Sequence, residues 1–144
     1  MGVVGDVRRA LGLPRESWLS LGRAMIELAV ARMRLGADHS RHLVNAKATR
    51  RVLLPAPLTS EQARLVDQVA FAIPRIAQRV PWRADCLIQA LAGERWLRRR
   101  GGCAQVVIGV KKGGLVPLDA HAWLEAGDRI VTGGDVASFK PLAD

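Results

Sequence analysis

Cys86 stands where a predicted helix start would make its thiol reactive. It directly follows Asp85, a favourable N-cap residue, and it opens an apolar helical pattern that a Gly-Gly pair ends at residues 101–102. The positive end of the helix dipole favours the thiolate over the thiol, and free backbone N–H groups there can hold an oxyanion. Cys86 is therefore a candidate nucleophile, although by position alone a buried structural cysteine is the more common outcome.

His121 and Asp135 complete a nucleophile–base–orienter set. His121 lies in a predicted strand and would take the thiol proton of Cys86, although taken alone it is more typical of a half-buried strand histidine. Asp135 follows a strand that runs back antiparallel, so it returns to the level of His121 and would fix the imidazole tautomer. Asp119 and Asp128 are alternatives, but one points alongside the ring and the other occupies the hairpin tip.

Three further residues near this set are candidates for the substrate pocket or the oxyanion site. Trp82 and Asp85 immediately precede the nucleophile, and Asp85 caps its helix. Trp123 shares the predicted strand face of His121, because residues two apart in a strand point the same way. Its indole could shield the Cys86–His121 pair from water.

The remaining histidines and cysteines predict neither a metal site nor a disulfide. His39 and His42 are three residues apart, but no Asp, Glu or Cys cluster adjoins them. Cys86 and Cys103 stand at opposite ends of one predicted helix, roughly 20 Å apart at about 1.5 Å per residue. A disulfide requires Cα atoms within about 7 Å. We expect free thiols and no cofactor.

The elements that must position these residues follow from hydrophobic periodicity. Three helices and three strands are predicted over residues 15–35, 60–80 (with a kink or restart at Pro74), 85–100, 106–110, 118–126 and 129–132. The tail after residue 133 is predicted to be irregular. Helices followed by an antiparallel meander define an α+β fold. We divide it into a helical N-terminal region at 1–57 and a core at 58–144, with a linker near Pro55-Ala56-Pro57.

The first of these helices, at residues 15–35, carries more apolar side chains than one buried face needs. Beside the main stripe, Ile26, Val30 and Met33 form a second strip. Packing in the core on two sides is the favoured interpretation, and contact with a partner is the alternative.

Composition limits the kind of protein. The 144 residues are 49% hydrophobic, which is typical of one globular domain with a moderate core. No apolar run approaches the ~20 residues that span a bilayer, and no signal segment begins the chain, so we expect a cytoplasmic protein. The net charge of +9 permits an acidic partner, nucleic acid or an anionic membrane surface. Few aromatic residues accompany the arginines, which argues against nucleic acid.

Four motifs in this order carry a family resemblance: Asp-Cys-Leu-x-x-Ala-Leu-Ala, Leu-Arg-Arg-Arg-Gly, Val-Val-Ile-Gly-Val-Lys and Ala-His-Ala-Trp-Leu-Glu. Over roughly residues 61–142 the chain resembles the transglutaminase-like leader peptidases of lasso-peptide biosynthesis. The resemblance implies a transglutaminase/papain-like core, in which the helix bearing the nucleophile packs on a small antiparallel sheet. It also implies that Cys86 is the nucleophile and His121 the base.

The resemblance further implies a bacterial cysteine protease that removes the leader from a ribosomally made precursor peptide. Its implied partners are a separate leader-binding protein with a winged-helix element and a macrolactam cyclase similar to asparagine synthetase. Two alternatives stay open from the sequence. One is an amidase or acyltransferase with the same thioester chemistry, and the other is a basic, helix-rich binding module without catalytic activity.

Overall fold

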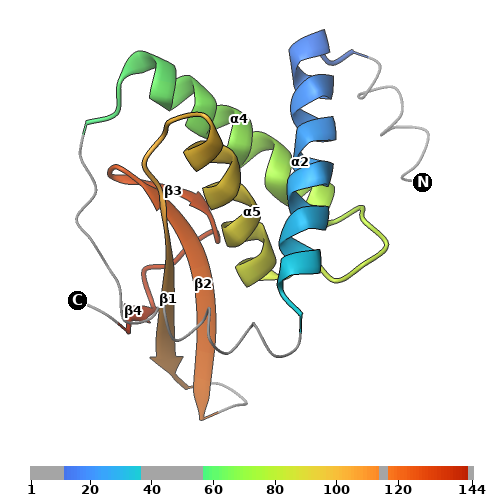
Figure 1. The fold of residues 1–144 in the computed structure, drawn as a ribbon. Helices are drawn as coiled ribbons and strands as arrows, with labels where there is room; N and C mark the ends of the chain where they lie inside the picture. The colour runs from blue at the N-terminus through green and yellow to red at the C-terminus, as the bar shows by residue number, and fades with distance from the viewer. Residues whose placement is uncertain (1–11, 37–56, 114–116, 143–144) are drawn as a thin grey trace.

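A computed structural model describes residues 12–36, 57–113 and 117–142, and these ranges contain three helices and four strands. In chain order they are α2 (Arg15–Arg34), α4 (Ser60–Ala77), α5 (Cys86–Arg99), β1 (Gln105–Lys112), β2 (Leu118–Ala126), β3 (Arg129–Thr132) and β4 (Lys140–Pro141). The strands form one antiparallel sheet in the order β3-β2-β1-β4. The predicted α+β class is confirmed. In Figure 1, α5 lies between α2 and the strands.

Local capping explains where two of the helices begin. The Thr59 hydroxyl accepts the N–H of Gln62 while the Gln62 side chain accepts the N–H of Thr59, a reciprocal capping box. The Asp85 carboxylate accepts the N–H of Ile88 at 3.1 Å and caps α5. α4 runs through Pro74 without a break, so of the two predicted outcomes, a kink or a restart, the restart is wrong.

The core lies between the helices and one face of the sheet. Its strand residues include Ala122, Leu124 and Ala126, which alternate along β2. Gly93 brings α5 close to this face, because a Cβ there would lie 2.6 Å from Leu124 Cδ2. The helix that begins with Cys86 is therefore held directly against the strand that carries His121.

The predicted irregular tail contains a short strand. Lys140 and Pro141 form β4, which pairs with Val110 and Gly109 of β1. The N–H of Leu142 then donates to the Ile108 carbonyl at 2.9 Å. Two residues give no periodicity to detect, and proline tolerates only an edge position because it lacks an N–H. The expectation of an irregular tail is wrong at these residues.

α2 packs on α4 and α5 through a narrow stripe that includes Ala24, Leu28 and Ala31. Its second apolar strip is not in the core, because Ile26 is 60% exposed and Met33 is 74% exposed. Core packing on two sides is therefore wrong for this helix. The predicted boundary at residues 57/58 adjoins residues 37–56, which lie outside the described ranges together with His39 and His42.

A buried carboxylate joins α2 to α5. Glu27 has no exposed surface, and one of its oxygens pairs with Arg23 Nε at 2.7 Å. The other oxygen pairs with Arg95 of α5, which keeps 22% of its side chain exposed. An unpaired carboxylate at this depth would be costly, so the two arginines are part of what makes the helix contact stable.

Replacing Glu27 with glutamine is expected to lower the free energy of unfolding by about 3 kcal/mol, since it leaves the partly buried guanidinium groups of Arg23 and Arg95 without their counter-ion. Urea unfolding followed by circular dichroism measures the change. Glu16 lies exposed on the same helix and provides the control. The control substitution Glu16→Gln is expected to cost less than about 1 kcal/mol. Equal losses in the two variants would show that the buried pairs contribute no more than a surface charge.

Candidate active site

Cys86 is the first residue of α5, as predicted, and its half-buried thiol is free. The Asp85 carboxylate accepts the N–H of Ile88. The N–H groups of Cys86 and Leu87, which precede it in the first turn, have no acceptor among the described residues. The helix start therefore offers two unpaired donors beside the sulfur. Asp85 itself serves as the cap and does not line the cavity described below.

His121 lies half-buried on β2, and its ring is held by a backbone group. Its Nε2 atom lies 2.7 Å from the carbonyl oxygen of Gly133. Since a carbonyl can only accept, this hydrogen bond requires the proton on Nε2 and leaves Nδ1 of the neutral ring as the basic nitrogen. The Phe139 ring packs beside the imidazole with centroids 4.9 Å apart. The histidine is thus fixed in both orientation and tautomer.

Cys86 and His121 face one cavity of about 500 Å³. The cavity lies where α4, the start of α5, β2 and the end of β3 come together, and its lining comprises Pro74, Cys86, Gln89, His121, Ile130, Val131, Thr132, Gly133 and Gly134. No hydrogen bond joins the thiol to the imidazole in the described part of the chain. Such contacts commonly tighten only when substrate is bound. A volume of this size accommodates a short stretch of peptide.

Asp135 lies just past this cavity and is exposed. Its Oδ1 atom accepts the N–H of Ala137 at 3.0 Å, a turn of the kind that Asp commonly forms with the residue two positions on. The group on the imidazole is the Gly133 carbonyl, two residues before the predicted aspartate. Asp135 as the residue that orients His121 stays a prediction, and the Gly133 carbonyl is a second candidate.

An Asp135→Asn variant distinguishes these candidates, because asparagine keeps the oxygen that accepts from Ala137 but removes the charge. With the Gly133 carbonyl as the main orienting group, we expect kcat to fall by less than about tenfold. An essential carboxylate would instead cost on the order of 10⁴-fold. Steady-state cleavage kinetics provide the measurement, and a loss approaching the larger figure would restore Asp135 as the orienting residue.

The two tryptophans take positions beside the site. Trp123 is 2% exposed, its ring centroid lies 6.3 Å from that of His121, and its N–H donates to Glu125. Trp123 fits there because residue 133 is glycine, with a φ of +112°. A Cβ atom at residue 133 would lie only 2.4 Å from Trp123 Cβ. Trp82 is half-buried, does not line the cavity, and its indole N–H has no partner among the described residues.

Sequence reasoning missed Gln89, Thr132 and Gly133. Gln89 lies one turn after Cys86 on α5, and its amide donates to the Ala84 carbonyl at 2.9 Å. The i+3 spacing could have revealed it. The hydroxyl of Thr132 is buried without a partner in the described ranges. Recognising Thr132 and Gly133 required the register of β3, which local sequence does not give.

The described residues contain no group of three His, Cys, Asp or Glu side chains that could hold a metal ion. Among the helices in the described ranges, none combines the length and the apolar character that crossing a membrane requires.

Comparison with known proteins gives one match. A family model described as the transglutaminase-like superfamily matches residues 25–144, which include Cys86, His121 and the whole sheet. No curated protein and no solved structure matches the chain.

Proposed function

The chain belongs to the transglutaminase-like superfamily, and on that premise we propose that it is a cysteine peptidase acting through Cys86 and His121. The observation that carries the proposal is their meeting in one cavity, with the thiol at a helix start and the imidazole held through Nε2. A half-buried structural cysteine would need neither a fixed histidine nor open space beside it. Asp135 is the candidate third member of the proposed site.

In the proposed mechanism, Nδ1 of His121 takes the proton from the Cys86 sulfur. The thiolate attacks the scissile carbonyl carbon, and the N–H groups of Cys86 and Leu87 donate to the resulting oxyanion. When the C–N bond breaks, the imidazolium gives its proton to the leaving amine. Water then attacks the thioester with the imidazole as base, which releases the carboxylate and restores the thiol.

We further propose that the substrate is a lasso precursor peptide from which this protein removes the leader. The four motifs named above support this assignment, since they span α5, β1 and β2 and include both Cys86 and His121. The proposed partners are a separate leader-binding protein with a winged-helix element and a macrolactam cyclase similar to asparagine synthetase. The half-exposed Ile130 is a proposed contact for the substrate at the cavity rim.

The experiment is incubation of a precursor peptide with this chain and the leader-binding protein, followed by mass spectrometry. The proposal requires two products whose masses sum to the precursor plus one water. A product carrying an added amine in place of water would favour the acyltransferase alternative, which uses the same thioester. An unaltered precursor under all partner combinations would contradict both enzymatic assignments.

A further inference from the structure

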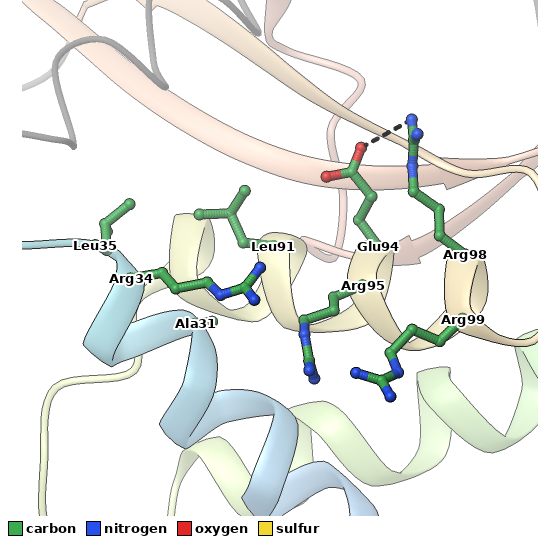
Figure 2. A pocket seen from close by; sticks show the side chains of 8 residues that line it. All are labelled: Ala31, Arg34, Leu35, Leu91, Glu94, Arg95, Arg98 and Arg99. Atoms are coloured by element: carbon green, nitrogen blue, oxygen red, sulfur yellow. Dashed lines mark ion pairs between the residues drawn. The ribbon is translucent and has the colours of Figure 1, made fainter.

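A second cavity, of about 500 Å³, lies between α2 and α5 (Figure 2). Its lining comprises Ala31, Arg34, Leu35, Leu91, Glu94, Arg95, Arg98 and Arg99. Four of these eight side chains are arginine and one is glutamate, so the lining carries a net charge of +3 beside an apolar floor of alanine and leucines. This combination differs from that of the catalytic cavity, whose only titratable residues are a cysteine and a histidine.

Two of the four arginines already have a counter-ion. Arg98 pairs with Glu94 at 3.3 Å, and Arg95 pairs with the buried Glu27. In Figure 2 the Arg98–Glu94 pair points away from α2, whereas the guanidinium of Arg95 lies on the α2 side of α5. The Arg98 charge is therefore neutralised at one edge of the cavity.

Arg34 and Arg99 are exposed and have no counter-ion in the described part of the chain. In Figure 2 the Arg34 side chain extends from α2 toward α5, and the Arg99 side chain points to the same side of α5 as Arg95. Two exposed guanidinium groups without a counter-ion among the described residues leave this cavity with an unbalanced positive charge, which attracts an anion. The planar fork of arginine suits a carboxylate, which it binds through two parallel hydrogen bonds.

We propose that this cavity binds an acidic segment of a partner protein, with carboxylates on Arg34 and on Arg99 and an apolar side chain on Leu35 and Leu91. The adjoining outer face of α2 supports a protein partner, because it exposes large apolar residues. Those residues are Trp18, Leu19, Met25, Ile26 and Met33. The partner is expected to present carboxylates next to apolar side chains.

The location and the charge of the chain disfavour other occupants. Arg95 lies nine residues after Cys86 on α5, which at 3.6 residues per turn places it on the opposite face of the helix from the thiol. The occupant is thus not the peptide adjoining the scissile bond. Residues 37–56 contain four Lys or Arg against one Asp, and a second copy would also bring a net charge of +9. Neither complements the arginines.

Fluorescence anisotropy with the full chain tests the proposal, using a labelled peptide of Leu-Glu-Glu repeats as the probe. We expect the chain to bind this peptide. The double variant Arg34→Gln and Arg99→Gln is expected to bind it about tenfold or more weakly, since each substitution removes a charge-assisted contact. The matched control is Arg15→Gln combined with Arg32→Gln, which changes the net charge equally at exposed positions of α2. The control is expected to stay within about twofold of the unaltered chain.

Several results would overturn the proposal. One is that the chain does not bind the peptide, and another is that it binds a Leu-Gln-Gln peptide equally well. A third is that both double variants weaken binding equally. The last is that Arg34→Gln combined with Arg99→Gln weakens binding of a labelled RNA oligonucleotide but not of the peptide. Because the assay measures binding without cleavage, its result is independent of whether Cys86 is a nucleophile. The proposed function and the proposed docking site can therefore fail separately.

Discussion

Cys86→Ala is expected to abolish precursor cleavage, with a loss of at least about 10⁴-fold in kcat/KM, while the protein remains folded. The thioester cannot form without the sulfur, and no other described residue of the cavity offers a comparable nucleophile with a fixed base. The side chain is only half-buried, so the melting temperature is expected to change by less than about 5 °C. Mass spectrometry of the products and circular dichroism on heating provide the two measurements.

Cys103→Ala is the matched control, because Cys103 is the other described free cysteine and lies exposed beyond the far end of α5. It is expected to cleave at the unaltered rate. Iodoacetamide should label Cys86 faster than Cys103 in the unaltered chain. If Cys86→Ala cleaves normally, the peptidase assignment fails, and if it unfolds, Cys86 has a structural role.

His121→Gln is expected to lower kcat by about a thousandfold with little change in stability. Glutamine can still donate an N–H to the Gly133 carbonyl, so the hydrogen bond seen at Nε2 has a replacement. What the variant lacks is a ring nitrogen that can take a proton from the thiol and return it to the leaving amine. The rates of acylation and of Cys86 alkylation should therefore fall together, which single-turnover kinetics and iodoacetamide labelling measure.

Asp119→Asn provides the control for this substitution, since Asp119 lies two residues away on β2 and pairs with Lys111, at 3.6 Å, at the sheet surface. Its kcat is expected to stay within about twofold. A His121→Gln protein that cleaves as fast as this control would mean that another group serves as the base.

The parts of the fold that the sequence predicted well depend on neighbours within a few positions. The start of α5 follows from Asp85, whose carboxylate needs only the N–H three residues on. The bounds of β2 and β3 follow from alternation around a turn at Gly127, which has a φ of +60°. The N-terminal position of Cys86 was predictable for the same reason.

The details that were not predictable depend on distant contacts. β4 consists of two residues that are a strand only because they pair with β1, and no local sequence pattern encodes that pairing. A register shift between Leu124 and Glu125, where β2 pairs with β3, helps determine which residue comes level with His121. The group found there is Gly133, and a bulge of this kind leaves no signature in the alternation of side chains. The sequence therefore predicted that Cys86 and His121 lie together, as they do on one cavity, but it did not predict the walls of that cavity.

The contact between His121 and Gly133 changes what mutagenesis can detect at this site. The acceptor is a backbone oxygen, so no side-chain truncation removes it, and under the proposed mechanism an alanine scan would find Cys86 and His121 but not the carbonyl that holds the imidazole. In the sequence, this carbonyl is visible only as a requirement for glycine at position 133. That requirement arises because any Cβ there would collide with Trp123, and the positive φ penalises every other residue.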